Sequence, residues 1–598
     1  MSQAPAPPPA HLCEYLTGTA RRSQWIWFGV SVVIATLYGV LALQQAFAGE
    51  YVVQDDARQH IFWMQRFVDP TLFPQDLIAD YFEGVAPLGY RWLYQFGAGL
   101  GVHPFTLGKV LPFFLSLITV SYAYWLVIEL FSLPLAGFIS SVGLNQSLWY
   151  SSEHASATPR AFLYPLLFAF LYYLIREKPL LYLLCLGLQA LFYPQIALIS
   201  LGVLVLRLLQ WQAGKLSLLR RWQPYVLFMV GFAGVAALLL WTRGQADFGA
   251  VISRAEAIAM AEFQPGGRNA FFRSGIDYWL QGRSGLFHER GFTPATIIAG
   301  FTLPLLLALP LKSRWRSLVT HKTGVLLQLL TASLGLFALS HLLLFQLHLP
   351  SRYSSHTIRA IAALTMGISW IIILDDVARV LAALWAKLRP PPGWGVLPRS
   401  RQRSLFTVLI SLLLVLVLGY PLFFFPRFPK VGYYDFSPNR SVYEYFAAQP
   451  VDSVIASLST EASNLPMLAA RTVLISPEHA IAYHQGYYGE FRQRVERLIE
   501  AQYTTDPEVL LGTIATYDVD FWLLDRTAFQ PDIVANSSWL RQYEPLASIA
   551  MQPLAHGAAP IIQQATAVCT TFETATLIVL AADCVTDWVG EVGDRPTG

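Results

Sequence analysis

The sequence predicts a polytopic α-helical membrane protein with about eleven transmembrane helices, followed by a small soluble α/β domain. Hydrophobic residues make up 55% of the 598 residues and charged residues only 13%, about half the charged share of a soluble globular chain. Apolar segments of spanning length recur along the first two thirds of the chain. After Pro426 the pattern changes to alternating short strands and helices. We therefore expect an integral membrane protein, surrounded by the lipid bilayer over most of its length.

The transmembrane region is expected over residues 25–425. It follows a Pro-rich stretch with the run APAPPPA, which predicts a disordered cytosolic tail over residues 1–24. Two of the predicted spans are short and broken by proline. The spans lie near residues 25–48, 108–131, 133–150, 160–175, 179–193, 194–209, 224–241, 293–311, 324–347, 358–376 and 405–425.

Positive charge gathers at alternate ends of these spans, which predicts the orientation in the membrane. Short loops rich in Lys and Arg stay in the cytosol, so we expect a cytosolic N-terminus and an extracytoplasmic C-terminal domain at the inner or plasma membrane. The net charge of only +3, without a basic stripe, argues against a nucleic-acid partner. The basic clusters are Arg21 and Arg22; Arg176 and Lys178; Lys215, Arg220 and Arg221; Lys312, Arg314 and Arg316; and those between residues 387 and 403.

Residues 426–598 have the pattern of a small extracytoplasmic α/β domain. Its candidate strands are SVIASL, RTVLIS and DFWLLD, and GEFRQRVERLIEAQY is a strong helix candidate. The region has no glycine-rich turn after a strand, no metal-ligand spacing and no nucleophile motif, which favours a structural or acceptor-docking role. Cys569 and Cys584 could form one disulfide, because the outer compartment is oxidising.

Two long outer loops are expected, at residues 50–107 and 243–292. In the first, the segment ARQHIFWMQRFV places apolar residues at helical spacing. This spacing predicts an amphipathic helix lying in the membrane interface, and GYRWLYQF predicts a second helix. These loops are long enough to carry a functional site.

The most informative residues are Asp55 and Asp56, which follow the first span on its outer side. Adjacent carboxylates at an interface repel one another and are costly to desolvate, so they need a cation, a helix N-terminus or a catalytic task. One aspartate could cap the helix that follows. Helical spacing also places Asp55 near Arg58, and Asp56 near His60, as local ion pairs. The residues alone leave these explanations and a functional one open.

This layout resembles the GT-C glycosyltransferases over about residues 25–425. The resemblance rests on the acidic pair in a long first outer loop, about eleven spans and a soluble outer domain. A second match is LPSRYSSH, an outer loop with Arg352 and Tyr353 before a late span. The family uses polyprenyl-phosphate sugars and includes mannosyltransferases, oligosaccharyltransferases and aminoarabinose transferases. The chain lacks the Asp-x-Asp spacing of the metal-dependent members and the acceptor-sequon signature of oligosaccharyltransferases.

The resemblance implies transfer of a sugar from a polyprenyl-phosphate donor to a glycan, lipid or protein acceptor on the outer side. It casts Asp55 or Asp56 as the general base, with inversion at the anomeric carbon. No cofactor is implied with certainty, and a divalent metal (Mg²⁺ or Mn²⁺) held by the two aspartates remains open. The leaving phosphate needs cationic and polar partners. Candidates are Arg58, His60, Arg160, Arg352, Tyr353, His356 and Arg359, each of which could instead be an interfacial anchor or a structural ion pair.

The second outer loop is glycine-rich and basic. It could close as a lid over the donor phosphate, or it could be an ordinary solvated loop. The sequence leaves both interpretations open. Its arginines are Arg268, Arg273, Arg283 and Arg290.

Two functions without covalent chemistry compete with glycosyl transfer. A transporter or flippase usually has ionisable groups near the bilayer midplane or two related halves. Here Glu129, Asp375 and Asp376 fall at predicted cytosolic ends of spans instead. A non-catalytic GT-C-like scaffold could display its outer domain to a partner, and the sequence does not separate it from an enzyme.

Overall fold

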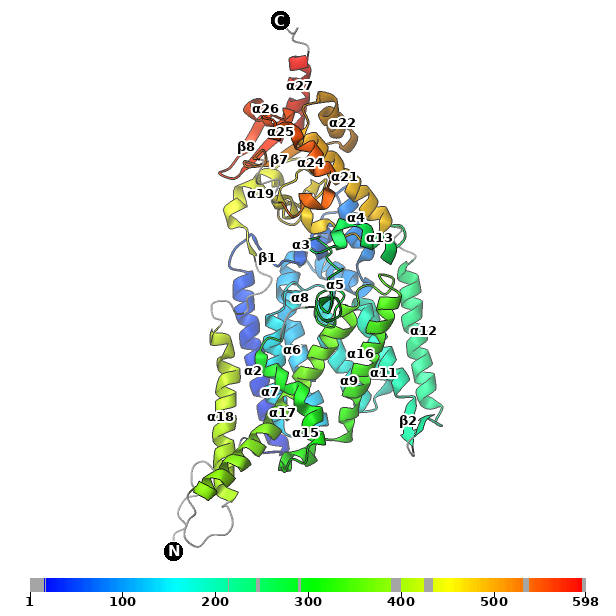
Figure 1. Ribbon diagram of the computed structural model, residues 1–598, viewed down its shortest axis with the longest axis vertical. Coiled ribbons are helices and arrows are strands. Elements are labelled where there is room, and N and C mark those ends of the chain that lie inside the picture. The colour runs from blue at the N-terminus through cyan, green and yellow to red at the C-terminus, as the bar shows by residue number, and fades with distance from the viewer. Residues whose placement is uncertain are drawn as a thin grey trace.

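The protein has two stacked regions, a helical bundle and an α/β domain at its upper end (Figure 1). The computed structural model describes residues 16, 18–212, 215–243, 248–288, 292–388, 399–423, 428, 434–530 and 537–593. The tail predicted over residues 1–24 lies outside the described residues except for 16 and 18–24. Helix α2 already begins at Arg21, so the first helix starts before the predicted span.

Helices occupy the places of all the predicted spans. Among the described residues, 6 helices are long and apolar enough to cross a membrane, and shorter apolar helices lie between them. The number of spans therefore remains a prediction. The helices are α2 Arg21–Ala46, α6 Pro104–Leu130, α7 Pro134–Trp149, α9 Leu163–Ile175, α10 Pro179–Phe192, α11 Pro194–Leu206, α12 Gln223–Arg243, η4 Ala295–Thr302, α15 Leu303–Ala308, α16 Gly324–Leu342, α17 Ser351–Leu388 and α18 Arg399–Phe423.

Helix α7 lies inside the bundle, and all 16 of its residues are buried. It packs against α2, α6 and α17. Glycines allow the helices to approach closely, because a Cβ at Gly367 of α17 would lie 2.2 Å from the carbonyl oxygen of Ala136 in α7. Small residues at helix contacts are the usual basis of packing between helices in a membrane.

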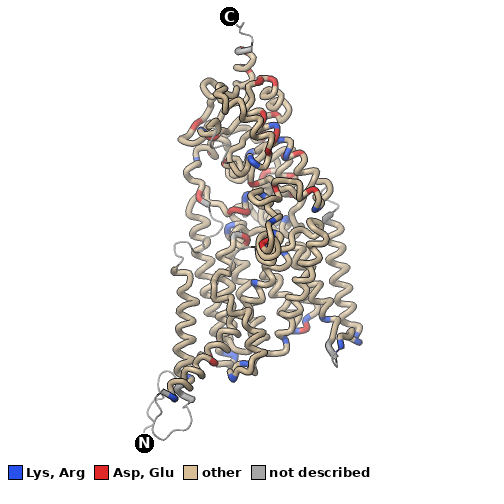
Figure 2. The backbone as a smooth tube through the Cα atoms, viewed as in Figure 1, with Lys and Arg blue, Asp and Glu red and all other residues tan. Residues whose placement is uncertain are grey.

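Charged residues concentrate at two levels of the molecule, with a band of helices between them that carries few (Figure 2). Near the C-terminal end of α6, Glu129 pairs with Lys322. The upper level is the junction between the bundle and the C-terminal domain. An apolar band crossed by long apolar helices is what a bilayer requires. The protein is therefore an integral membrane protein.

The C-terminal domain is built around a five-stranded sheet. Its elements are α19 Arg440–Ala447, β5 Val454–Ala456, β6 Thr472–Val473, α21 Gln485–Tyr503, α22 Pro507–Tyr517, β7 Phe521–Asp525, α26 Ile561–Cys569, β8 Thr570–Glu573, β9 Leu577–Ala581 and α27 Ala582–Gly593. The strand order is β6-β5-β7-β9-β8, with β5 parallel to β6 and β7 and with β9 antiparallel to β7 and β8. The three predicted strands are present as β5, β6 and β7, and α21 contains the predicted helix. A disulfide joins Cys569 to Cys584.

The first long loop, over residues 50–107, folds beneath the C-terminal domain and shares one hydrophobic core with it. The Tyr81 ring stacks on Tyr487 of α21 with 3.7 Å between centroids, and Phe62 meets His479 edge-on at 5.1 Å. The loop contains β1 Val52–Val53, α3 Ala57–His60, the 3-10 helix η1 Phe62–Phe67, α4 Leu77–Val85 and α5 Leu88–Gly99. β1 also pairs with β4 Tyr434–Asp435, at the start of the C-terminal region.

The amphipathic helix predicted over residues 57–68 is wrong as a continuous element. The α-helix ends at His60 and a 3-10 helix follows from Phe62. Phe62, Trp63 and Met64 are consecutive and all fully buried, which no single helical face allows. Packing against the C-terminal domain has overridden the local periodicity. The second predicted helix, over residues 89–96, is confirmed as part of α5.

The second long loop, near residues 243–292, is hydrogen-bonded to the C-terminal domain. Its buried Glu262 accepts hydrogen bonds from Arg492 Nη1 at 2.6 Å and from Tyr488 Oη at 2.7 Å, both on α21. Asn269 Nδ2 donates to the carbonyl oxygen of Ala480 at 2.9 Å. The loop therefore contacts the C-terminal domain through Glu262 and Asn269, while Ser284 and Leu286 contact His341 of α16 and Ser354 of α17. Arg290, one of the predicted lid arginines, lies outside the described residues.

Candidate active site

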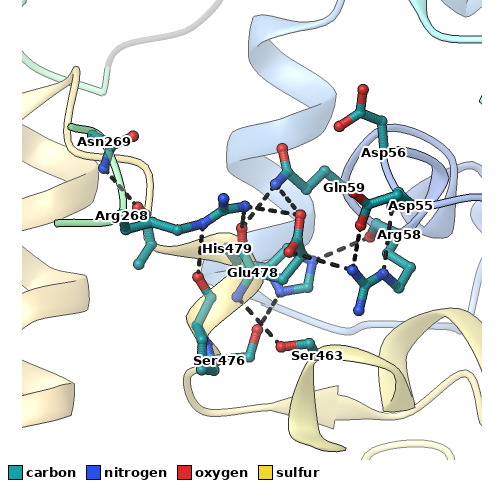
Figure 3. A network of polar contacts seen from close by, with 12 residues as sticks. Asp55, Asp56, Arg58, Gln59, Arg268, Asn269, Ser463, Ser476, Glu478 and His479 are labelled. Carbon is teal, nitrogen blue, oxygen red and sulfur yellow. Dashed lines mark hydrogen bonds and ion pairs between the residues drawn. The ribbon is translucent and has the colours of Figure 1, made fainter. Parts of the chain in front are cut away.

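The acidic pair lies at the junction between the bundle and the C-terminal domain. Asp55 and Asp56 form the turn between β1 and α3, and their side chains point in different directions (Figure 3). Asp56 stands at the N-cap position of α3, but its side chain makes no capping hydrogen bond. The explanation of the pair as a helix cap is therefore wrong. Each carboxylate instead belongs to a separate group of four charged side chains.

We call the first group the Asp55 quartet: Asp55, Arg58, Glu478 and Arg268. Arg58 Nη2 lies 2.5 Å from Asp55 Oδ1 and 3.5 Å from Glu478 Oε2. Arg268 Nη2 lies 2.9 Å from Glu478 Oε1. The quartet thus joins both long outer loops to the C-terminal domain (Figure 3). The local pair of Asp55 and Arg58 expected from helical spacing is present within it.

Further hydrogen bonds fix the Asp55 quartet in place. Gln59 Nε2 donates both to the Glu478 carboxylate and to its backbone carbonyl oxygen. Arg268 donates to the carbonyl oxygens of Pro477 and Glu478, each at 3.1 Å. His479 Nε2 lies 3.2 Å from the carbonyl oxygen of Arg58, and a carbonyl oxygen can only accept, so Nε2 carries the proton. Residues 477–479 are therefore bound through backbone as well as side-chain groups.

A tight glycine turn places Arg268. A Cβ at Gly267 would lie 2.4 Å from the carbonyl oxygens of both Ala261 and Glu262. Backbone atoms cannot yield as a flexible side chain can, so the turn requires glycine at this position. The PGGRN sequence thus directs its arginine toward Glu478.

We call the second group the Asp56 quartet: Asp56, Arg160, Glu153 and Arg352. Arg160 spans two carboxylates, with Nη2 at 2.6 Å from Asp56 Oδ2 and Nη1 at 2.5 Å from Glu153 Oε1. Arg352 Nη1 lies 2.8 Å from Glu153 Oε1. Glu153 lies in α8 Ser152–Ala155, Arg160 in the 3-10 helix η2 Pro159–Phe162, and Arg352 in the first turn of α17. Apart from Asp56, this quartet is built on the upper ends of bundle helices.

The environment keeps the Glu153 carboxylate charged. Burial by itself raises the pKa of Glu153, but His356, Arg160 and Arg352 outweigh burial and hold that pKa well below its usual range. Burial lowers the pKa of His60 to about 4, an effect that Asp56 opposes only in part. His60 is therefore neutral at pH 7, and it can offer a hydrogen bond but not the positive charge that a phosphate attracts.

In contrast to Glu153, Glu478 has a pKa that is raised. Burial raises the pKa of Glu478, and Arg268 and Arg58 offset this only in part. Asp55 and Asp56 act in the same direction as burial. The carboxylate of Glu478 is therefore held where its negative charge is disfavoured, even though it has two guanidinium partners.

The remaining candidates lie at different places around these quartets. His356 Nε2 lies 3.5 Å from Glu153 Oε2. Tyr353 Oη donates to the carbonyl oxygen of Leu347 and so supports the turn before α17. Arg359 lines a small cavity of about 10 Å³ together with Glu153 and Arg160. That volume suits about one water molecule, so a sugar could enter only after side chains move.

The carboxylates do not fit a divalent metal held by both aspartates. Asp55 and Asp56 each bind a different arginine. Within the described parts of the chain, no three His, Cys, Asp or Glu side chains are grouped as metal ligands.

Sequence reasoning missed the two glutamates that organise the quartets. Glu153 stands in SSEHASATPR, seven residues before the candidate Arg160. An acidic residue close in sequence to a candidate arginine was the signal that could have identified Glu153. Glu478 lies 420 residues from Arg58 in the sequence. No local pattern links residues so far apart.

The whole fold matches solved structures. No protein-family model matches the sequence, and no curated protein matches it. An archaeal oligosaccharyltransferase, AglB from Archaeoglobus fulgidus, solved with an inhibitory peptide and a dolichol-phosphate, superimposes with a TM-score of 0.52 at 12% identity, over 88% of this chain and 72% of that one. The apo form of the A. fulgidus oligosaccharyltransferase gives a TM-score of 0.50 at 12% identity, over the same shares. This chain has the fold of these oligosaccharyltransferase structures.

A third structure extends the comparison. ArnT from Cupriavidus metallidurans, bound to undecaprenyl phosphate, matches with a TM-score of 0.43 at 11% identity, over 93% of this chain and 98% of that one. The fold assignment depends on the two oligosaccharyltransferase structures. The shared fold agrees with the fold that the resemblance implies, and at 12% identity the comparison shows the fold alone.

Proposed function

We propose that the protein is a membrane glycosyltransferase, which transfers a sugar from a polyprenyl-phosphate donor to an acceptor hydroxyl on the extracytoplasmic side. One observation carries the proposal: two adjacent aspartates, each in an arginine-containing quartet, lie at the upper end of a membrane bundle with a GT-C fold. The oligosaccharyltransferase with that fold was solved with a dolichol-phosphate, which supports a lipid phosphate as the leaving group. The acceptor is a glycan, a lipid or a protein.

Asp56 is the general base in this proposal. Only one of its carboxylate oxygens, Oδ2, pairs with Arg160, so the other can take a proton. Its quartet lies on the ends of the bundle helices, near the level of lipid headgroups, where a membrane-bound donor arrives. Asp55 is instead joined to the C-terminal domain through Arg58 and Glu478, and its role is to position Arg58.

The proposed step is a direct displacement. The oxygen of the acceptor hydroxyl attacks the anomeric carbon and forms the new glycosidic bond, while its proton passes to Asp56. The bond from that carbon to the phosphate oxygen breaks, and its electron pair leaves with the polyprenyl phosphate. Attack opposite the leaving group inverts the configuration. A carboxylate can act as the base because the hydroxyl becomes more acidic as the bond forms.

The arginines of the Asp56 quartet serve the leaving group. The phosphate gains negative charge as the bond breaks, and fixed cations in a poorly hydrated site stabilise that charge. Arg160 and Arg352 are mostly buried, with 15% and 11% of their side chains exposed. Glu153 holds both of them, so they need little reorganisation during the reaction.

An activity assay on purified full-length protein tests the assignment. Wild type, Asp56→Asn and Asp55→Asn are incubated with a lipid-linked sugar donor and candidate acceptors. Loss of the general base should lower kcat by about 10²–10⁴-fold in Asp56→Asn. Asp55→Asn should lose about tenfold, because it only releases Arg58. Asp69→Asn is the matched control, since this exposed acid of the same loop contacts Thr71.

The outcomes separate the competing functions. Unchanged turnover in both aspartate variants rejects the proposed base. Movement of the lipid-linked sugar across the membrane without transfer favours a flippase. Binding of a partner to the C-terminal domain, with no turnover on any lipid-linked sugar, favours a non-catalytic scaffold.

The proposed orientation places the acidic pair outside the cell membrane. The basic clusters predicted on the cytosolic side and the disulfide of the C-terminal domain support it. Cys13 is first replaced by serine so that it does not react. In this background, Glu50→Cys, at a position where 67% of the glutamate side chain is exposed, should react with an impermeant maleimide added outside. A cysteine at Lys215 should react only after the membrane is opened. The reverse pattern contradicts the orientation and, with it, the site.

A further inference from the structure

We propose that Arg58, Gln59 and Arg268 form an anion-binding subsite, and that the Glu478 carboxylate fills it in place of a phosphate group. The inference rests on the proposed function: the subsite takes the phosphate of the lipid-linked donor as it enters, before that phosphate reaches Arg160 and Arg352. Glu478 then acts as an internal plug, which a phosphodiester or phosphate monoester displaces.

The geometry is that of an anion site assembled from separate segments. Glu478 Oε1 accepts from Arg268 Nη2 at 2.9 Å and also from Gln59 Nε2. Its Oε2 faces Arg58 Nη2 at 3.5 Å. Two charged donors and one amide therefore surround a single carboxylate (Figure 3). The same combination of planar guanidinium groups and an amide suits the oxygens of a phosphate.

The donors remain in position when the carboxylate leaves. Arg268 keeps its hydrogen bonds to the carbonyl oxygens of Pro477 and Glu478. Arg58 keeps Asp55 and the side-chain oxygen of Asn464, which it contacts at 2.9 Å. Gln59 keeps the carbonyl oxygen of Glu478 at 2.9 Å. A rotation of the Glu478 side chain alone thus opens the subsite, without separation of the C-terminal domain.

The balance of charge sets the class of ligand. Two carboxylates face two guanidinium groups in the Asp55 quartet, so the group is neutral with Glu478 in place. Removal of that carboxylate leaves one net positive charge. A phosphodiester carries one negative charge and so restores neutrality. It also offers acceptor oxygens in tetrahedral directions, which reach all three donors better than a planar carboxylate does.

The Glu478 carboxylate also binds only weakly in the subsite. Its carboxylate is 13% exposed and lies close to Asp55 and Asp56, whose negative charges oppose its own. A ligand with its own apolar anchor in the bilayer gains binding energy that the glutamate lacks. A lipid-linked phosphate can therefore displace it, whereas chloride and other small inorganic ions have no such anchor.

Binding measurements on the full-length protein in detergent test this subsite. The probes are farnesyl phosphate and inorganic phosphate, and the variants are Glu478→Gln and the double variant Glu478→Gln with Arg268→Met. Removal of the competing charge should lower the Kd of farnesyl phosphate about tenfold. The double variant should lose that gain, because one of the two charged donors is gone. Glu496→Gln is the matched control, since Glu496 pairs with Arg492 on the exposed side of α21.

The two probes distinguish a lipid phosphate from a free phosphate. A gain for farnesyl phosphate alone assigns the subsite to a lipid phosphate, and a gain for both probes assigns it to the phosphate group itself. No gain for either probe, in a Glu478→Gln protein with an unchanged unfolding temperature, overturns the proposal. So does a gain that persists after Arg268→Met.

The test does not depend on turnover. Asp56→Asn should retain the tenfold gain produced by Glu478→Gln, because the base takes no part in binding at this subsite. Loss of turnover in Asp56→Asn without any gain from Glu478→Gln leaves the proposed function and rejects the subsite. A gain in binding from Glu478→Gln, with no turnover in wild type or any variant, supports the subsite and rejects the proposed function.

Discussion

The Asp55 and Asp56 quartets contain the same charges but are held in different ways. The Asp56 quartet lies on the ends of bundle helices, and its ion pairs are 2.5–2.8 Å long. The Asp55 quartet joins segments up to 420 residues apart, and its contact between Arg58 and Glu478 is 3.5 Å. One group is fixed by the fold of the bundle. In the other, a single glutamate side chain from the C-terminal domain links the two guanidinium groups.

This difference supports the different tasks that we propose for the two aspartates. A base and its leaving-group cations must be held within a fraction of an ångström during the reaction, which favours groups on rigid helices. A subsite that admits and releases a substrate must be able to change. The Asp56 quartet meets the first requirement and the Asp55 quartet the second. Matched changes in the two groups test this proposal.

The largest expected effect comes from Glu153→Gln. Only 11% of its side chain is exposed, and the change leaves Arg160 and Arg352 without their shared carboxylate. Breaking a buried ion pair from one side costs about 3–5 kcal/mol of unfolding free energy. Denaturant unfolding in detergent measures it. Glu478→Gln is the paired change in the other quartet and should cost less than about 1 kcal/mol, because the pKa of Glu478 shows that its charge is disfavoured. Equal costs in the two variants would end the distinction between a fixed and an adjustable quartet.

A second comparison exchanges arginine for lysine in each group. Arg160 uses two nitrogens of one planar group to reach Asp56 and Glu153, and a single ammonium cannot hold both in that geometry. Arg160→Lys should therefore lower kcat by about 10²-fold. Arg58→Lys should lower kcat less than about tenfold and mainly raise the KM of the donor. The measurement is steady-state turnover over a range of donor concentrations. A larger loss of kcat in Arg58→Lys would reverse the assignment of the base.

The bundle was predictable from sequence because lipid imposes a simple rule. Long apolar segments must form helices to satisfy their backbone groups, so the predicted spans coincide with helices. The outer region follows no such rule. The segment ARQHIFWMQRFV has the spacing of a helix, yet it breaks after His60, where Phe62 and Trp63 are buried in a core that the loop shares with the C-terminal domain. The hairpin of β8 and β9 was missed in the same region.

The candidate site was predictable only in part. Arg160 and Arg352 stood at predicted outer ends of spans, and the structure brings both to Glu153. Tyr353 was a candidate partner of the phosphate, and its hydroxyl donates to the backbone carbonyl oxygen of Leu347. The sequence pattern does not reveal this contact. The meeting of Arg58 with Glu478 depends on the docking of the C-terminal domain, which leaves no trace in local sequence.

A smaller effect is expected from Gly267→Ala. The new Cβ would meet the carbonyl oxygens of Ala261 and Glu262 at 2.4 Å, so the turn must shift and move Arg268. We expect a loss of about 1–3 kcal/mol in unfolding free energy, with a higher KM for the donor and little change in kcat. Gly489→Ala on α21 is the control, since nothing lies within 4 Å of its Cβ position and alanine favours a helix. A lower kcat at unchanged KM would contradict the role of Arg268 in binding.

The smallest effect is a difference in the pH dependence of stability. The folded pKa of Glu153 is lowered, so its contribution is present above the unfolded value of about 4.3 and is lost as the pH falls through the folded pKa. The folded pKa of Glu478 is raised, so its contribution is present below about 4.3 and is lost as the pH rises through the folded pKa. Between pH 4.5 and 7, therefore, stability changes through Glu478 and not through Glu153.

Unfolding temperatures of wild type and Glu478→Gln at pH 5 and pH 7 measure this difference. The variant lacks the titrating group, so its stability relative to wild type should be greater at pH 7 than at pH 5. His479 lies beside Glu478, but burial lowers its pKa to about 3, and it stays neutral over this interval. Groups far from the change titrate equally in both proteins and cancel. If the difference between the two proteins is the same at both pH values, Glu478 is fully charged throughout the interval. It would then be a firm structural ion pair, and the adjustable character of the Asp55 quartet would have no physical basis.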